Sequence, residues 1–211
     1  MNEEQAREAL ARHGRSLFAR GYSCGTSGNL SVRLDTGGYL MSPTNVSLGR
    51  LEPGALSRLD MDGRHVDGPA PTKEAWLHFA MYKSRPDDTA VVHLHSTYAT
   101  ALSCLTDRPP DDVLPAITPY VVMRVGRVAR VPYFRPGNAD AAGTISQLAV
   151  SHRALLLANH GPVVSGSDLD TAVSAAEELE ETAKLFFILG DRPQWRLGPA
   201  EIDELRRVFG S

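Results

Sequence analysis

The amino-acid sequence predicts an α/β layered fold built on a mixed β-sheet. Segments with helical and strand-like patterns alternate through most of the chain, which favours helices packed on a sheet. An early hairpin adds antiparallel pairing, so the sheet is expected to be mixed rather than purely parallel. The chain has 211 residues and shows no linker, internal repeat or low-complexity tract, which predicts one domain over residues 1–211.

The first third of the chain is expected to form a helix, a hairpin and a turn-rich segment. Residues 3–20 carry apolar side chains near one helical face and precede Gly21, a residue that commonly ends helices. Residues 30–34 and 39–41 flank two glycines, which is typical of a β-hairpin. Residues 52–68 contain one Pro-Gly and two Asp-Gly pairs, so we expect turns and at most short strands there.

The rest of the chain alternates between expected helices and extended segments. Thr72 and Pro86 are the expected N-cap and stop of one helix, which would turn Trp76, Phe79 and Ala80 inward. Ser96 is the expected cap of the next helix, and the longest helix carries an apolar stripe. The helices are expected at 72–84, 97–105, 139–151, 168–189 and 199–209, and the extended segments at 91–95, 120–131 and 154–158.

Composition and charge exclude several classes of partner. The net charge of −3 provides no broad positive field for nucleic acid or an anionic membrane. The longest apolar runs fall far short of the roughly 20 residues that cross a bilayer. The acidic, polar start does not resemble a secretory signal, and two cysteines cannot build a disulfide framework. We therefore expect a cytoplasmic protein without nucleic-acid or membrane partners.

Three histidines and one glutamate predict a metal centre. His93 and His95 alternate along an expected strand, so both imidazoles would face the same side. His160 follows another apolar run at an expected strand end, and Glu74 lies in the expected first turn of its helix. Such a donor set suits a divalent transition metal, zinc first. The other histidines are expected to be surface or packing residues: His13, His65, His78 and His152.

Three small polar loops could together hold one phosphate group. Each loop offers backbone N–H groups and hydroxyls, and one of them lies at an expected helix N-terminus, where an anion is favoured. The glycines fit neither the P-loop nor the dinucleotide-binding spacing. The loops are residues 26–29, 42–45 and 71–73.

The ordered set of these motifs resembles the class II aldolase/adducin family over about residues 5–190. The matching runs are Gly28-Asn29-Leu30-Ser31, Ser42-Pro43-Thr44, Thr72-Lys73-Glu74, His93-Leu94-His95 and Asn159-His160-Gly161. The resemblance implies a three-layer αβα domain with a central mixed, largely antiparallel sheet. It also implies a homotetramer with active sites at subunit interfaces, and one Zn²⁺ per subunit, with Mn²⁺ or Co²⁺ as other possible ions.

The resemblance assigns roles to individual residues. The metal ligands would be His93, His95, His160 and Glu74, and Glu74 would serve as the acid/base during turnover. Tyr120, from a neighbouring subunit, is a second candidate for proton transfer. The residues expected around the substrate phosphate are Thr26, Gly28, Asn29, Ser42, Thr44, Thr72 and Lys73.

Longer runs resemble the subfamily that decarboxylates 3-oxo-tetronate 4-phosphate. They cover residues 41–45, 71–74, 93–97, 118–126 and 132–137. This likeness implies a carbon–carbon lyase acting on a small phosphorylated sugar acid. Its products would be carbon dioxide and dihydroxyacetone phosphate, formed through a metal-stabilised enediolate.

Two other functions stay open at this point. An aldolase or epimerase acting on a sugar phosphate, such as fuculose 1-phosphate or ribulose 5-phosphate, would keep every metal ligand. Asn45 stands where the aldolases usually have glycine, and Lys73 where they usually have a small hydroxyl residue, which disfavours aldol substrates. Lys73 could pair with the departing carboxylate or the phosphate, or remain solvated. A non-catalytic, adducin-like interaction domain is disfavoured by the complete set of metal ligands.

Overall fold

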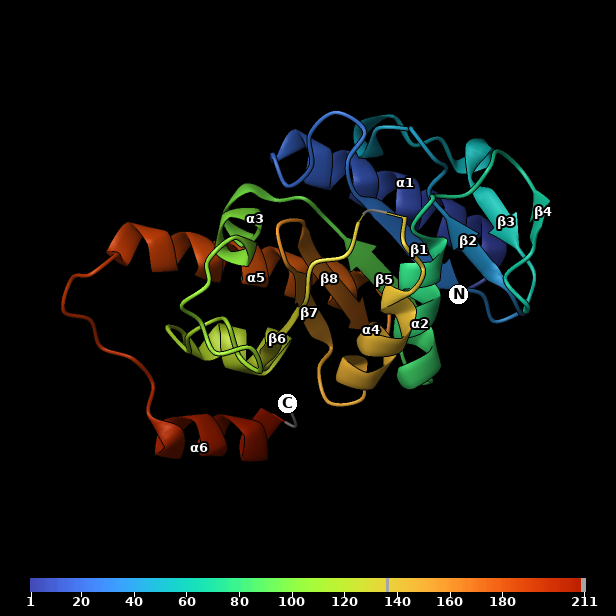
Figure 1. The fold of residues 1–211 in the computed structure, drawn as a ribbon. Coiled ribbons are helices and arrows are strands. Elements are labelled where there is room, and N and C mark those ends of the chain that lie inside the picture. The colour runs from blue at the N-terminus through green and yellow to red at the C-terminus, as the bar shows by residue number, and fades with distance from the viewer. Residues whose placement is uncertain (136, 210–211) are drawn as a thin grey trace.

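An eight-stranded sheet with helices on both faces forms the centre of the computed structural model, which describes residues 1–135 and 137–209 (Figure 1). The strand order is β4-β3-β2-β1-β5-β8-β7-β6. Neighbouring strands pair antiparallel, except β6 and β7, which are parallel. The predicted α/β class with a mixed, largely antiparallel sheet is therefore confirmed. Pro136, in one of the runs quoted above, and the last two residues of the expected domain lie outside the described residues.

The strands are short, and the predicted hairpin is present as β1 and β2. In chain order they are β1 (Asn29–Arg33), β2 (Tyr39–Met41), β3 (Ser57–Leu59), β4 (His65–Asp67), β5 (Ala90–His93), β6 (Val128–Val131), β7 (Ala154–Leu157) and β8 (Gly161–Gly166). The turn between β1 and β2 contains Gly37 and Gly38, both with positive φ angles of 90° and 77°. Glycine adopts this left-handed backbone without strain, which allows the tight reversal.

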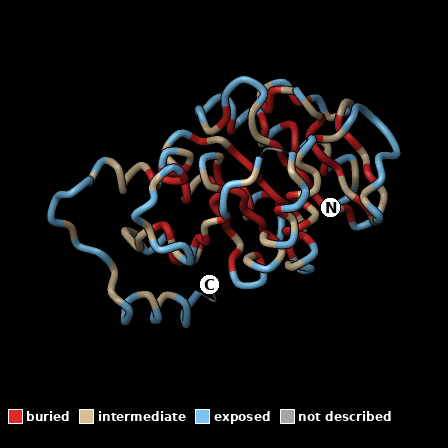
Figure 2. The backbone as a smooth tube through the Cα atoms, viewed as in Figure 1, coloured by how far each residue is buried: buried red, intermediate tan, exposed pale blue. Residues whose placement is uncertain are grey.

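The helices form two layers. In chain order they are α1 (Glu3–Ala19), α2 (Ala75–Ser84), α3 (Thr97–Ser103), α4 (Ala141–Ala149), α5 (Leu169–Leu189) and α6 (Pro199–Phe209). One apolar cluster joins α1, α3 and α5 to the sheet, and a second joins α2 and α4 to its other face. Adjacent sheet residues alternate between the clusters: Val92 and Val164 belong to the first, Val91 and Val163 to the second. Figure 2 shows this buried material running through the middle of the molecule.

Two expected segments have a different conformation. Residues 121–125, expected to be extended, form a π-helical turn that ends at Gly126, whose φ is 75°, so that only Val128–Val131 pairs as a strand. Residues 161–166 form β8, which the sequence did not predict. This strand is buried along its whole length between β5 and β7, so its residues do not alternate between polar and apolar.

Several element boundaries were also misplaced. The helix α2 begins at Ala75, because the Thr72 hydroxyl accepts the N–H of Glu74 in a turn before the helix. Of the residues expected to point inward, Ala80 is buried, whereas Trp76 and Phe79 are half-buried at the edge of the second cluster. The strand β5 ends at His93, two residues before His95.

The start of α3 is fixed by a carboxylate on α5. The N-cap residue Ser96 makes no side-chain hydrogen bond to the helix, in contrast to the expectation. Tyr98 and Ala99 instead donate their backbone N–H groups to Glu180, at 2.8 and 2.7 Å. Glu180 is only 7% exposed, so these charge-assisted bonds form in a largely dry environment. Because α3 begins only two residues after His95, this contact also helps to position that histidine.

Both cysteines are free and exposed, and no helix among the described residues is long and apolar enough to span a membrane. The structure therefore agrees with the expected lack of a disulfide framework.

Gly161→Ala is expected to destabilise the protein by about 1–3 kcal/mol, because overpacking forces the backbone apart. A Cβ atom at Gly161 would lie 2.3 Å from the carbonyl oxygen of Leu94, which separates His93 from His95. Gly143→Ala in α4 is the matched control, since a Cβ there meets nothing within 4 Å. Urea unfolding of both variants provides the measurement. Equal stability of Gly161→Ala and the wild type would show that the strands can separate without cost.

Candidate metal centre and anion cradle

Four potential metal ligands converge beside the ends of β5 and β7 and the start of α2. The Nε2 atom of His95 lies 3.2 Å from that of His93 and 3.1 Å from that of His160. The carboxylate oxygens of Glu74 lie 3.5 Å from His93 Nε2 and 3.4 Å from His160 Nε2. Each residue thus offers one donor atom, and all four atoms lie within 4.8 Å of one another.

Local backbone geometry explains how His160 reaches the cluster. It follows Asn159, which has a φ of 55° in the tight turn between β7 and β8. Asparagine adopts this left-handed conformation more readily than most residues. The N–H of His160 donates to the Leu157 carbonyl at 3.1 Å, and the Thr100 hydroxyl donates to the His160 carbonyl at 3.2 Å. The turn and α3 therefore hold the backbone of His160 from two sides.

Four of the distances within the cluster are close to those expected between the ligand atoms of one metal ion. Zinc bonds of 2.0–2.1 Å to nitrogen and oxygen place neighbouring ligand atoms about 3.3 Å apart. The four contacts above, at 3.1 to 3.5 Å, lie around this value. His93 Nδ1 donates to the Pro162 carbonyl at 2.8 Å, which leaves the lone pair of Nε2 directed at the cluster. The donor set therefore fits one divalent cation.

The electrostatics of the cluster favour the protonation states that bind metal. Burial lowers the pKa of His93 to about 3 and is also the main cause of the lowered pKa values of His95 and His160. Burial opposes ionisation of Glu74, but His93, Asn29 and the other imidazoles outweigh it, so the pKa of Glu74 lies below its usual value. Neutral imidazoles beside an ionised carboxylate are ready to coordinate a cation.

A chain of buried hydrogen bonds runs behind Glu74. Asn29 Nδ2 donates to Glu74 Oε2 at 2.8 Å, and His78 Nε2 donates to Asn29 Oδ1 at 2.5 Å. The Ser31 hydroxyl donates to His78 Nδ1 at 2.7 Å, and the Tyr82 hydroxyl donates to Ser31 Oγ at 2.8 Å. With every donor facing the next acceptor, the chain orients the Asn29 amide so that its NH₂ group points at the carboxylate.

His78 is the site residue that sequence reasoning missed. It was expected to be a surface or packing residue, and it is indeed fully buried, but it also reaches Glu74 through Asn29. Burial lowers the pKa of His78 to about 4, so the ring is neutral near pH 7. A sequence signal existed, because His78 is a polar residue next to Leu77 on the buried side of α2.

A cavity of about 370 Å³ lies beside the metal cluster. The loops that form it are joined by backbone hydrogen bonds: Thr72 N–H to the Ser42 carbonyl at 3.2 Å, and Thr44 N–H to the Ala70 carbonyl at 3.0 Å. Gly28 has a φ of 80°, and a Cβ there would lie 3.1 Å from the His93 carbonyl. Six of the seven residues expected around the phosphate line this cavity, namely Thr26, Gly28, Asn29, Thr44, Thr72 and Lys73.

Two expected site residues lie elsewhere within the described chain. Ser42 is buried behind the cavity, where its hydroxyl accepts the N–H of Leu30 at 3.0 Å. Ser42 therefore supports the loop rather than facing the hollow. Tyr120 is 53% exposed, and the guanidinium of Arg124 lies 5.1 Å from the centre of its ring. Tyr120 is not among the residues that line the cavity.

Comparison with known proteins gives consistent results. A model of the "Class II Aldolase and Adducin N-terminal domain" matches residues 8–187. The 3-oxo-tetronate 4-phosphate decarboxylase of Escherichia coli (strain K12) is 50% identical over 97% of this chain and 96% of its own length. The L-fuculose phosphate aldolase of Methanococcus maripaludis is 36% identical over 84% of this chain and 93% of its own. The crystal structure of YgbL from Klebsiella pneumoniae, a putative aldolase/epimerase/decarboxylase, matches with a TM-score of 0.95 and 48% identity, covering 98% of this chain and 100% of that chain.

Proposed function

The chain belongs to the class II aldolase and adducin family, and from this premise we propose that it decarboxylates 3-oxo-tetronate 4-phosphate to dihydroxyacetone phosphate and carbon dioxide. The observation that carries the proposal is 50% identity, over nearly the whole chain, to decarboxylases with this substrate. Identity to the fuculose phosphate aldolase is lower, at 36%. The metal ligands alone would serve either reaction.

The cavity supplies groups suited to each end of this substrate. The phosphate fits the cradle formed by the loops at Gly28, Thr44 and Thr72, where N–H groups and hydroxyls are available. Lys73 lines the same cavity and adds the positive charge that a phosphate or a departing carboxylate requires. The other end of the substrate then lies toward His95 and Glu74, which border the cavity.

The residues of the metal cluster have separate roles in the proposed reaction. The three histidines would hold a divalent cation, which would supply Lewis acidity toward the ketone of the substrate. As carbon dioxide leaves, the electron pair of the broken carbon–carbon bond passes into an enediolate. Glu74, once its carboxylate has moved away from the cluster and taken up a proton from solvent, gives that proton to the carbon that lost carbon dioxide. Asn29 and His78 hold the carboxylate in place between turnovers.

The metal ion and the oligomeric state are proposed from membership of the family. We propose Zn²⁺ as the resident ion, with Mn²⁺ or Co²⁺ as substitutes, and a cytoplasmic homotetramer in which residues 1–211 form one domain. The exposure of Tyr120 supports a role across a subunit interface, where its hydroxyl would reach the cavity of a neighbouring chain.

The proposed reaction is tested by assaying the purified protein on three substrates. Carbon dioxide release from 3-oxo-tetronate 4-phosphate is expected, with neither aldehyde formation from fuculose 1-phosphate nor epimerisation of ribulose 5-phosphate. An aldehyde product without carbon dioxide release would identify an aldolase instead. Metal analysis of the same sample separates an enzyme from a non-catalytic interaction domain, since the latter should contain no stoichiometric metal.

His78→Phe is expected to lower kcat about 10- to 100-fold while changing KM little, as is typical when a partner behind a metal ligand is lost. The phenyl ring fills the space of the imidazole but cannot donate to Asn29, whose amide is then free to turn its oxygen toward Glu74. The control is His152→Phe, which replaces another buried histidine, bonded to the backbone of Leu148 and Asp111. Equal kcat losses in both variants would reduce His78 to a packing residue.

The same variant tests how the stability of the protein depends on pH. The pKa of His78 falls from 6.5 to about 4 on folding, so below pH 6.5 the unfolded chain takes up a proton that the folded chain excludes. This histidine therefore lowers wild-type stability as the pH falls from 6.5 toward 4. His78→Phe should lose less stability over that range, which urea unfolding at pH 7 and pH 5 measures.

A further inference from the structure

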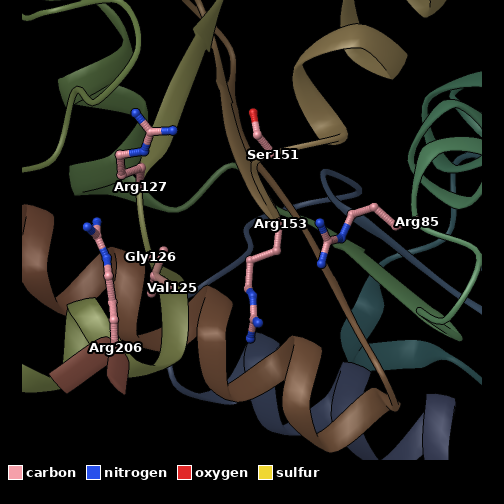
Figure 3. Close-up of a pocket in the computed structure, with 7 residues that line it drawn as sticks. All are labelled: Arg85, Val125, Gly126, Arg127, Ser151, Arg153 and Arg206. Atoms are coloured by element: carbon pink, nitrogen blue, oxygen red, sulfur yellow. The ribbon is translucent and has the colours of Figure 1, made fainter. Parts of the chain in front are cut away.

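A second hollow, of about 360 Å³, is lined by four arginines (Figure 3). The arginines come from four separate segments: the end of α2, the turn before β6, the residue before β7, and α6. In Figure 3, the guanidinium groups of Arg127 and Arg206 lie on one side of the hollow, and those of Arg153 and Arg85 on the other. The lining residues are Arg85, Val125, Gly126, Arg127, Ser151, Arg153 and Arg206.

This hollow lies at the opposite end of the sheet from the metal cluster. Arg153 precedes the first residue of β7, whereas His160 follows the last. Arg85 lies before β5, whose final residue is His93. Each strand has four residues, so its length of about 13 Å separates the two sites. The hollow is therefore distinct from the cleft to which the proposed reaction is assigned.

Nearby carboxylates compensate only part of the positive charge. Asp88 accepts from Arg85 Nε at 2.5 Å and from the Ser165 hydroxyl at 2.6 Å, so one carboxylate is paired with this arginine. The contacts of Arg127 with Asp111 and of Arg206 with Asp203 are long, at 3.9 and 3.8 Å, and lie on the surface.

Arg153 is the least compensated of the four. Within residues 1–135 and 137–209, it takes part in no ion pair shorter than 4.0 Å. Guanidinium groups that line one hollow repel one another where carboxylates do not compensate their charge, and an anion between them reduces that repulsion.

We propose that this hollow, defined here as the arginine pocket, binds a small molecule with two or more phosphate or carboxylate charges. Guanidinium groups present paired N–H donors that match phosphate and carboxylate oxygens, and the four groups approach from different sides. The volume falls within the range of small-molecule sites. The chain as a whole has a net charge of −3, which disfavours an extended polyanion such as nucleic acid.

Binding at the arginine pocket would attach α6 to the body of the protein. This helix lies beyond an extended segment that leads away from α5 (Figure 1), and none of its residues is buried. Only Ile202 and Leu205 pack partly against the core. An anion held jointly by Arg206 of α6 and Arg153, which precedes β7, would therefore add a second contact to this limited packing.

Calorimetric titration with inorganic pyrophosphate tests the proposal at physiological ionic strength. Metal content is measured before and after, so that chelation is not mistaken for binding. Wild-type protein is expected to bind at two places per chain, the cradle and the arginine pocket. Arg127→Ala/Arg153→Ala should weaken one of them at least tenfold, whereas Thr44→Val/Lys73→Ala should weaken the other. Arg64→Ala, which removes an exposed arginine paired with Asp62, is the control and should change neither.

A second readout follows the helix itself. Pyrophosphate should slow amide hydrogen exchange in residues 199–209 of the wild type and of the cradle variant, but not of the arginine-pocket variant. Unchanged pyrophosphate binding by the arginine-pocket variant would overturn the proposal. A change of molecular mass in that variant, with both binding events kept, would also overturn it and identify the arginines as a contact between chains. Failure of the proposed decarboxylation would leave this test unaffected, since it measures binding alone.

Discussion

Replacing His95 with alanine is expected to remove the metal and the activity together. His95 Nε2 lies 3.2 Å from His93 Nε2 and 3.1 Å from His160 Nε2, so its loss removes one of the four donor atoms of the cluster. Even residues that only support a metal ligand change affinity by about 10- to 100-fold. Loss of a ligand itself should exceed this range, and kcat should fall to the background of the assay.

Metal content and turnover are to be measured on the same preparation of His95→Ala, together with its melting temperature. His65→Ala is the matched control, because His65 is exposed on β4 and its ring hydrogen-bonds only to the carbonyl of Asp67 among the described residues. The control should keep both metal and activity. A folded His95→Ala protein with stoichiometric metal and normal turnover would remove this histidine from the ligand set.

Glu74→Gln is expected to lower kcat by about 10²- to 10⁴-fold, the usual contribution of a general acid or base. The amide has the shape of the carboxylate and its oxygen can still accept from Asn29, so the fold and phosphate binding should survive. The substitution removes the negative charge that lies 3.5 Å from His93 and 3.4 Å from His160. It also removes the carboxyl group, which is the part of residue 74 that can take up and release the transferred proton.

Steady-state kinetics at matched metal occupancy separates these effects. KM for the phosphorylated substrate should change much less than kcat, because the cradle is intact. Glu181→Gln, on α5, is the control for loss of one negative charge and should behave as the wild type. Near-normal turnover by Glu74→Gln would exclude Glu74 from proton transfer and direct attention to Tyr120.

The metal cluster was accessible from sequence because its members occur in short, local patterns. His93 and His95 are two residues apart, so any extended backbone turns both toward one side, even though β5 ends at His93. His160 lies in a turn directly after a buried apolar run, which marks the end of a strand. Their meeting with Glu74 is a tertiary event, which the donor set suggested and the family resemblance then implied.

Other features depend on contacts that no local pattern records. His78 acts through Asn29, which is 49 residues away in sequence. The Ser42 hydroxyl bonds to the backbone of β1, so a residue expected to face the phosphate lies behind its loop. Strand β8 has glycine at both ends and neighbours on both sides, and its full burial removes the alternation that identifies a strand. The four arginines of the arginine pocket are brought together only by the sheet and α6.

The contact between Glu180 and α3 has a consequence for how accurately His95 is placed. Two N–H groups in the first turn of α3, a helix of seven residues, donate to the two carboxylate oxygens of Glu180 on α5, a helix of 21 residues. These two hydrogen bonds depend on the exclusion of solvent, because they weaken as the local dielectric constant rises. Substitutions that admit water between α5 and α3, even far from the metal cluster, would therefore make the position of His95 less precise.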